Sequence, residues 1–295
     1  MMYTEFISSE GLIRHARKSM MKLDISNEER PIGIQFFGGE IDTMVQCVDI
    51  IEEAKPDLID INFGCPVKNV ACRGAGAGIL KDVPKMVSMT AEIVKRAHLP
   101  VTIKTRLGWD EKSKNVIDVA ERLQDVGIAA ITIHGRTREQ MYKGHADWTL
   151  IGGVKNNQRI KIPVFANGDI DSAETAIYVR NTFGVDGVMI GRAAIGYPWI
   201  FNDIKHFIKT GQHLPEPDIE ERIKVCRIHL HKSIEWKGPK LGILEMRRHY
   251  ANYFRGLPGV KAYREQLVTF ETLAELEQVL QSMALTYKDV LSVAS

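Results

Sequence analysis

One stretch of the sequence decides the fold: Val101-Thr102-Ile103-Lys104-Thr105-Arg106. Its β-branched residues predict a strand, and Lys104 and Arg106 stand two residues apart, which places them on the same side of that strand. Mainly apolar strands of this kind are buried on both faces of parallel sheets, so Lys104 needs an anion or an electron-rich ring as its partner. Similar runs occupy residues 32–37, 58–63, 129–134, 162–166 and 185–190, and residues 2–6 are a weaker candidate for one more strand.

Segments with the periodicity of amphipathic helices lie between these runs. After Asp82, which is a suitable N-cap, apolar residues recur at intervals of three and four up to Ala97. A regular exchange of buried strands and helices is typical of parallel β/α units. The predicted fold class is therefore α/β.

Polar side chains stand at the carboxyl end of nearly every predicted strand. In a (β/α)8 barrel all of these ends meet on one face and build the active site, whereas in an open sheet they would not. A doubly wound sheet would also carry a G-x-G-x-x-G turn after an early strand, and the sequence has none in that context. We therefore predict a (β/α)8 TIM barrel whose first strand is missing from this chain, followed by a small C-terminal helical domain. The polar residues are Gln35, Asn62, Cys65, Lys104, Arg106, His134, Arg136, Asn167, Asp169 and Arg192.

Composition indicates an ordinary globular protein. Hydrophobic residues make up 44% of the chain and charged residues 26%, which excludes a disordered or fibrous protein. The strand pattern stops near Pro215, so we predict a barrel domain over residues 1–214 and a helical domain over residues 215–295. The sequence has no apolar run of about 18 residues, no signal peptide, and no C-x-x-C pair among its four cysteines. We expect a cytoplasmic protein without a membrane segment or a metal site.

Positive charge is concentrated in the helical part. The whole chain of 295 residues has a net charge of +2, but residues 222–264 hold eleven Lys or Arg and two Glu, a net charge of +9. This segment is either a solvated helical face or a footprint for a phosphate backbone. Tyr250, Tyr253 and Phe254 stand among its arginines, which adds to the second interpretation.

Cys65 is the candidate catalytic residue. It follows Asn62-Phe63-Gly64 at the end of a strand and precedes Pro66, so we expect a sharp turn with the thiol over the barrel mouth. A thiol is mostly protonated at neutral pH and can act as a proton donor. The alternative is that Cys65 is a small buried hydrophobic residue.

Two glycine-containing loops follow the last two predicted strands, Ala166-Asn167-Gly168-Asp169 and Ile190-Gly191-Arg192. The corresponding loops of TIM barrels often bind phosphate, because glycine lets backbone N–H groups approach an oxyanion and arginine supplies the counter-charge. We therefore predict a phosphate site at these loops.

Together these motifs resemble those of the tRNA-dihydrouridine synthases, flavin-dependent barrels that reduce the 5,6 double bond of uridine in tRNA. The resemblance runs from about residue 3 to the C-terminus. Family members begin with a strand that ends in a Pro-Met-x-G-like turn, which has no counterpart before Met2 in this sequence. The matching stretches are Asp60–Pro66, Thr102–Trp109, Thr132–Arg138, Ala166–Ile170 and Met189–Ala194, with Arg247-Arg248-His249 and Tyr253 in the helical part.

The resemblance implies FMN across the barrel mouth, NADPH as the electron donor and tRNA as the substrate, with no obligate protein partner. Hydride would pass to C6 of the uracil while Cys65 delivers a proton to C5. The residues implied to contact FMN are Gln35, Lys104, His134 and Asn167, with Gly168, Asp169, Gly191 and Arg192 at its phosphate. The residues implied to contact tRNA are Asn62, Arg106, Arg136, Arg138, Arg247 and Arg248.

Three other functions fit parts of the sequence. An FMN oxidoreductase acting on a free pyrimidine would use the same strand ends, but it leaves the basic segment unexplained. A non-catalytic tRNA-binding protein would explain that segment and would tolerate an absent strand. A barrel acting on sugar phosphates would explain the two glycine-containing loops, but it would leave Cys65 and Lys104 without a function.

Overall fold

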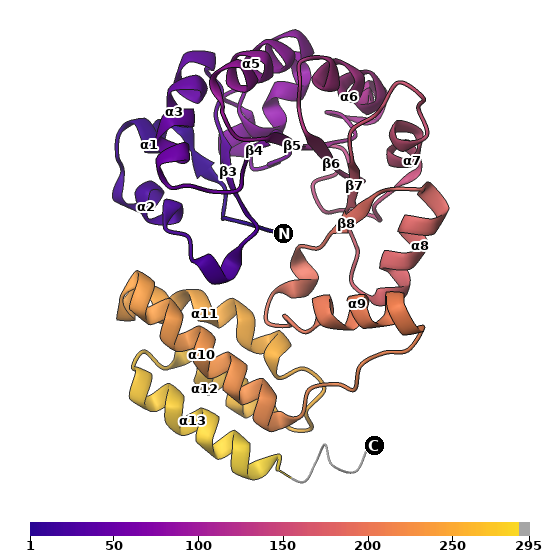
Figure 1. Ribbon diagram of the computed structural model, residues 1–295. Helices are drawn as coiled ribbons and strands as arrows, with labels where there is room; N and C mark the ends of the chain where they lie inside the picture. Colours follow the sequence, from indigo (N-terminus) through magenta and orange to yellow (C-terminus); the bar gives the residue numbers. More distant parts are fainter. Residues whose placement is uncertain (289–295) are drawn as a thin grey trace. The chain divides into compact units, whose positions relative to one another are not determined.

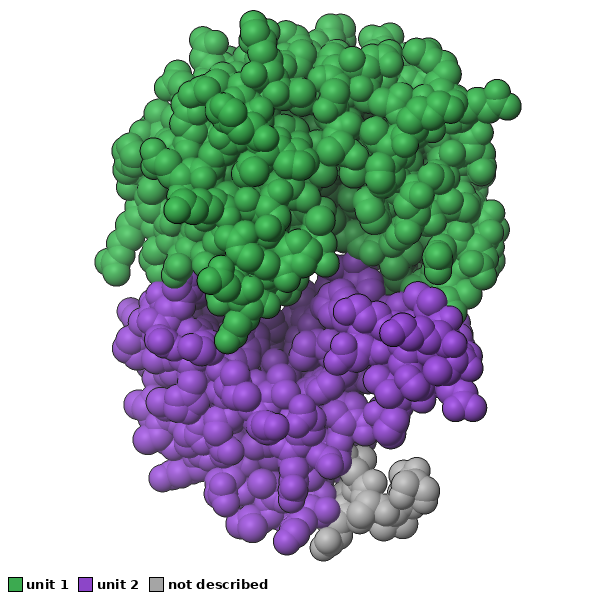
Figure 2. Space-filling view, in the orientation of Figure 1, with its two compact units in different colours: residues 1–170, 176–189 green, residues 171–175, 190–295 purple. Residues whose placement is uncertain are grey.

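The computed structural model describes residues 1–288, and the chain divides into two compact units (Figure 2). Unit 1 comprises residues 1–170 and 176–189. Unit 2 comprises residues 171–175 and the chain from residue 190 onward. The predicted division at residue 214, into an FMN-binding and a tRNA-binding domain, concerns function and stays a prediction.

Unit 1 is built on a parallel sheet in the order β1-β3-β4-β5-β6-β7-β8, with β2 also paired to β3. The prediction of parallel β/α units is confirmed, since each of the six predicted runs contains a strand and residues 2–6 contribute β1. The arrangement is TIM-barrel-like. Within residues 1–288 the hydrogen-bonded path starts at β1 and ends at β8, so it forms part of a barrel. The strands are β1 (Met2–Tyr3), β2 (Ile7–Ser8), β3 (Ile32–Phe37), β4 (Leu58–Asn62), β5 (Val101–Arg106), β6 (Ala130–His134), β7 (Val164–Asn167) and β8 (Gly187–Met189).

Helices connect successive strands and lie on the outside of the curved sheet (Figure 1). The helix predicted after Asp82 is confirmed: the Asp82 side chain accepts a hydrogen bond from the backbone of Lys85, and Pro84 stands in the first turn. The helices of this part are α1 (Ser9–Ile13), α2 (Arg17–Met20), α3 (Ile41–Glu53), α4 (Lys68–Ala71), α5 (Val83–Arg96), α6 (Val116–Asp125), α7 (Thr149–Lys155) and α8 (Ala173–Phe183).

Register within the sheet decides where the polar strand ends lie. Asn62 of β4 is paired with Lys104 of β5, and Arg106 of β5 is paired with His134 of β6. His134 is in turn paired with Asn167 of β7. Because paired positions in a sheet point the same way, this register brings these side chains to one edge. The strands are held by a core that includes the fully buried Ile34, Ile59, Ile61, Ile103, Ile131 and Ile133.

Unit 2 is a helical bundle. Its longest helices, α10 and α11, are joined at Gly238, whose φ of +81° suits glycine. The buried Arg222 of α10 donates to the carbonyl of Pro217 (2.8 Å), which precedes α10, and to that of Arg255 (2.9 Å), which follows α11. The helices are α9 (Ile200–Thr210), α10 (Ile219–Lys237), α11 (Pro239–Tyr253), α12 (Lys261–Thr269) and α13 (Leu273–Thr286).

The chain that follows β8 is attached to this bundle. Asn252 of α11 donates a hydrogen bond of 2.6 Å to the carbonyl of Ile195. Next to it, Gly196 has a φ of +67°, and a Cβ there would stand 2.2 Å from the carbonyl oxygen of His249. These contacts explain why residues from 190 onward belong to the same unit as the helices.

We expect the bundle to depend on Leu230, which is fully buried in α10. Leu230→Ala removes apolar contacts and leaves a cavity, so the free energy of unfolding should fall by about 2–5 kcal/mol. Urea unfolding followed by helical circular dichroism measures this change. Leu244→Ala is the matched control, because Leu244 in α11 is 42% exposed and surface substitutions change stability by about 0.5 kcal/mol. Equal losses in the two variants would contradict this account of the core.

Candidate active site

A buried carboxylate lies at the centre of the polar edge of unit 1. Asp60, in β4, is 1% exposed. Its two oxygens accept hydrogen bonds from Gln35 Nε2 (2.6 Å) and Thr102 Oγ1 (2.5 Å), so donors on both neighbouring strands hold it. Burial raises the pKa of Asp60 to about 6, although these hydrogen bonds and the charge of Lys104 act in the opposite direction.

The network continues from Asp60 to the turn that carries Cys65. Gln35 Oε1 accepts a hydrogen bond of 2.7 Å from Asn62 Nδ2. Asn62 Oδ1 then accepts from the backbone N–H groups of Gly64 (3.0 Å) and Cys65 (2.9 Å). One amide side chain thus fixes the sharp turn that the sequence predicts after β4.

Cys65 itself is 5% exposed. Its carbonyl accepts from the backbone of Ala77 (3.0 Å), and Gly76 packs so close that a Cβ there would lie 3.0 Å from Cys65 Cβ. On the other side, the thiol is near enough to Lys104 and Arg106 that a charge on its sulfur would raise the pKa of both. The thiol therefore lies among the polar groups of the edge.

Lys104 is the cation next to this thiol. Its side chain keeps some contact with solvent but lies deep among protein atoms, and this burial lowers its pKa to about 8, with a further contribution from the charge of Arg106. The charges of Asp60 and Cys65 act in the opposite direction. Lys104 therefore gains most from a negative group placed beside it.

Arg106 connects two loops. The residue is 2% exposed. Its guanidinium donates to the carbonyls of Gly64 (2.7 Å), Thr137 (3.0 Å) and Met141 (3.0 Å). Burial lowers the pKa of Arg106 to about 10, which leaves it protonated at neutral pH. In this structure its donors serve the loops after β4 and β6, and its predicted contact with tRNA stays a prediction.

Arg136, also 2% exposed, forms a bidentate ion pair with Asp169, with Nη1 3.0 Å from Oδ1 and Nη2 2.5 Å from Oδ2. The guanidinium also lies 3.3 Å from His134 Nε2. Since a guanidinium cannot accept, that nitrogen is the acceptor and the imidazole proton is on Nδ1. Burial lowers the pKa of His134 to about 2, with further contributions from Arg106, Lys104 and Arg136, so the ring is neutral.

Gly168 stands where no side chain fits. Its φ is +108°, and a Cβ would lie 2.8 Å from Ala146 Cβ and 2.9 Å from His134 Cδ2. The preceding residue, Asn167, donates to the carbonyl of Met189 at 2.8 Å, which joins the ends of β7 and β8. The loop after β7 is thus fixed tightly against β6 and its loop.

Four predicted site residues belong to unit 2 and are described within it. Gly191 precedes the short helical turn Arg192–Ala194, and a Cβ on it would meet no atom within 4 Å. Arg247 and Arg248 stand in α11, where Arg247 Nη2 lies 3.9 Å from Glu271 Oε1 and Arg248 is exposed. Arg138 lies against Trp109, apart from the other predicted residues. Unit 1 brings together the remaining ones, which are Gln35, Asn62, Cys65, Lys104, Arg106, His134, Arg136, Asn167, Gly168 and Asp169.

Sequence reasoning did not single out Asp60 and Thr102 as site residues. The signal was present, because a carboxylate in the middle of an apolar strand must have buried partners. Elsewhere in residues 1–288, no group of three or more His, Cys, Asp or Glu side chains is placed to hold a metal ion. No helix in that part of the chain has the length and apolar character needed to cross a membrane.

The family described as dihydrouridine synthase matches residues 1–289. The chain belongs to the dihydrouridine synthase family. It is 38% identical to a probable tRNA-dihydrouridine synthase 1 of Synechocystis over 288 residues, 98% of this chain and 80% of that protein. It is also 38% identical to tRNA-dihydrouridine synthase B of Pseudomonas putida over 271 residues, 92% of this chain and 80% of that protein.

Membership of this family gives the activity. The protein is an enzyme of tRNA dihydrouridine synthesis, a flavin-dependent oxidoreductase acting on tRNA uridines, as the resemblance in its motifs predicts. Among solved structures, histamine dehydrogenase from Rhizobium has a TM-score of 0.50 at 11% identity, covering 69% of this chain and 40% of that one. This likeness concerns the fold alone and agrees with a TIM-barrel-like sheet.

The electrostatic link between Asp60 and Lys104 gives a testable prediction. Asp60→Asn removes a negative charge that raises the pKa of Lys104, so this pKa should fall further below its value of about 8. NMR titration of the lysine side-chain signals between about pH 6 and pH 10 measures the midpoint. Asp57→Asn, at a half-buried carboxylate paired with Arg30, is the control and should leave the titration unchanged. An unchanged midpoint in Asp60→Asn would refute the coupling.

Proposed function

We propose that unit 1 binds FMN at the polar edge of its sheet, that NADPH supplies the electrons, and that Cys65 is the proton donor in the reduction of tRNA uridines. The donor set fits a flavin. The amide nitrogens of Gln35, Asn62 and Asn167 each donate one hydrogen bond within the protein and have a second N–H for a polar ring edge, and Lys104 offers a cation. The chemistry that FMN supplies when bound is hydride transfer to C6 of the uracil.

The observation that carries the proposal is the position of Lys104. A lysine whose pKa burial has lowered to about 8 stands beside a thiol and a network of amides. It is still mostly protonated at neutral pH, and low polarity around it strengthens its attraction for negative charge. Lys104 would therefore stabilise an anionic ring held against it. His134, which is neutral, would lie close to that ring without adding charge.

We assign the phosphate of FMN to the loops after β7 and β8. Gly168 leaves its loop free of a side chain, so backbone N–H groups of Gly168 and Asp169 can approach an oxyanion. The carboxylate of Asp169 is paired with Arg136, so Asp169 would serve through its backbone. For Gly191 and Arg192, which belong to unit 2, we also propose a contact with the phosphate of FMN, with Arg192 as the counter-charge.

Cys65 would deliver its Sγ proton to C5 as the hydride arrives at C6. The reaction leaves a thiolate on Cys65, and the nearby charges of Lys104 and Arg106 stabilise that thiolate. Asn62 has the positioning task, because its side chain holds the backbone of Cys65 in the turn. These residues thus account for both the proton and the charge that remains after it has left.

The uridine must leave its stack to reach this edge, which favours accessible loops of tRNA. We propose that Asn62, Arg106, Arg136 and Arg138 contact the RNA near the base, and that Arg247 and Arg248 contact its backbone. The net charge of +9 over residues 222–264 supports tRNA over a free pyrimidine as the substrate. A cytoplasmic location and the absence of an obligate protein partner complete the proposal.

The decisive variant is Cys65→Ala. With FMN, NADPH and unmodified tRNA, it should keep the flavin absorbance spectrum and NADPH oxidation but form dihydrouridine at least about a hundredfold more slowly, because general acid catalysis is lost. Mass spectrometry of the digested tRNA measures the product.

Cys72→Ala is the matched control, since Cys72 is an exposed cysteine only seven positions along the chain. It should form dihydrouridine at the wild-type rate. Wild-type activity in Cys65→Ala would refute the proton-donor role, and a colourless wild-type protein in the presence of FMN would refute the flavin site.

A further inference from the structure

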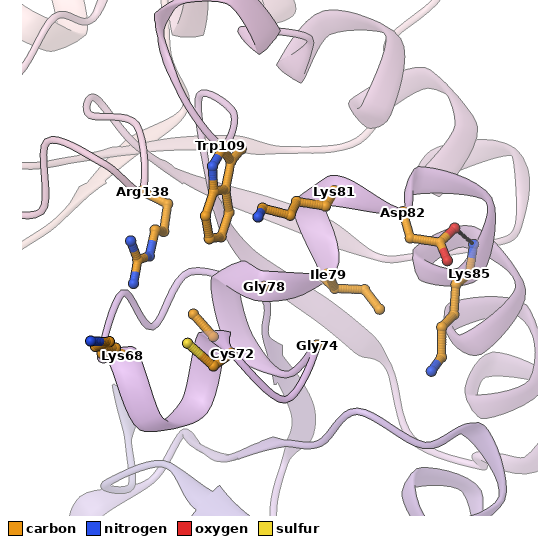
Figure 3. A pocket seen from close by; sticks show the side chains of 11 residues that line it. Lys68, Cys72, Gly74, Gly78, Ile79, Lys81, Asp82, Lys85, Trp109 and Arg138 are labelled. Atoms are coloured by element: carbon orange, nitrogen blue, oxygen red, sulfur yellow. Dashed lines mark hydrogen bonds between the residues drawn. The ribbon is translucent and has the colours of Figure 1, made fainter.

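A basic pocket of about 600 Å³ lies in unit 1 (Figure 3), and of its lining residues only Arg138 has a role in the proposed function. Four cationic side chains line it, Lys68, Lys81, Lys85 and Arg138, and Asp82 is the one carboxylate in its lining. Asp82 is engaged as the N-cap of α5, where it accepts from the backbone of Lys85 at 3.0 Å. The pocket is therefore strongly positive.

An indole ring holds two of these cations in place. Lys81 Nζ lies 3.9 Å from the centroid of Trp109, and Arg138 Cζ lies 4.7 Å from it. Figure 3 shows the ring standing between the two side chains. A nucleobase would have to displace a cation to stack on this ring. The arrangement thus favours an anion over an aromatic ligand.

Most of this positive charge is unbalanced. Within residues 1–288 no carboxylate forms an ion pair with Lys68, Lys81 or Arg138, and Arg138 Nε is buried without a hydrogen-bond partner. Lys85 is paired with Glu40, whose Oε1 lies 3.4 Å from Lys85 Nζ. Cations that are held close together without counter-charges attract a polyanion.

The pocket shares its chain segment with Cys65. Lys68 opens the short helix α4 three residues after Cys65, and Lys81 ends the turn Gly76–Lys81, whose Ala77 donates to the Cys65 carbonyl. Trp109 and Arg138 follow β5 and β6, so they also come from the carboxyl ends of the strands. The pocket and the candidate active site are thus built from the same loops.

We propose that this pocket binds a backbone phosphate of tRNA adjacent to the uridine that is reduced. The proposal rests on the proposed function and adds a contact outside the reacting base. Lysine and arginine contacts to phosphates position a nucleic acid without reading its sequence. Such a contact would anchor the strand on the loop that carries Cys65, so that the extruded base is presented to the thiol in a constant position.

The test is the double variant Lys68→Gln, Lys81→Gln in the full-length protein loaded with FMN. Both lysines are exposed, so the fold should be unaffected. Affinity for unmodified tRNA is measured by fluorescence anisotropy at several salt concentrations. The slope of log K against log salt concentration becomes less negative by about one for each phosphate contact that is lost. When the salt is lowered from 1 M to 0.1 M, the variant should therefore gain about tenfold less affinity than the wild type. We expect at least one such contact to be lost.

Lys161→Gln is the matched control, because Lys161 is exposed and precedes β7, at the amino end of the sheet. Affinity and slope of the double variant equal to those of this control would overturn the proposal. A raised KM for NADPH with unchanged tRNA affinity would also overturn it, since the pocket would then serve the phosphates of the dinucleotide. Binding is measured without turnover, so a failure of the proposed reaction is detected separately by the absence of dihydrouridine.

Discussion

The geometry of the polar edge of unit 1 depends on one constraint: the carboxylate of Asp60 is buried inside a parallel sheet. Such a group is tolerated only when its oxygens have hydrogen-bond donors. Gln35 and Thr102 supply them from the two neighbouring strands, and Gln35 passes the connection on to Asn62. The same Asn62 holds the turn of Cys65. The need of a buried carboxylate for hydrogen-bond donors therefore fixes, through Asn62, the position of Cys65.

The charges at this edge follow from the same packing. Three cations, Lys104, Arg106 and Arg136, lie together with the carboxylates of Asp60 and Asp169. Burial keeps the neighbouring His134 neutral, and the three cations add to this effect. A site of this kind favours an occupant that carries or develops negative charge. A reduced flavin and, in the reaction that we propose, the thiolate of Cys65 would both meet that condition.

Local pattern in the sequence was sufficient to predict the parallel strands, the capped helix after Asp82 and the convergence of polar strand ends. These features depend on residues within one strand or one helical turn. The roles of Arg106 and Arg136 could not be predicted, because Arg106 donates to carbonyls 31 to 42 residues away in the chain and Arg136 pairs with a carboxylate 33 residues away. The partners of Asp60 escaped prediction for the same reason, since register between strands selects them.

The hydrogen bond from Asn252 to Ile195 affects how this enzyme can be recombined with its relatives. A crossover at Pro215 and Pro217 would look natural from the sequence, but it would pair α11 of one parent with the segment after β8 of another. The close approach of Gly196 to His249 would then have to form between surfaces that come from two different parents. Chimaeric proteins that exchange the helical bundle are better joined before residue 190, so that the segment and its helix are inherited together.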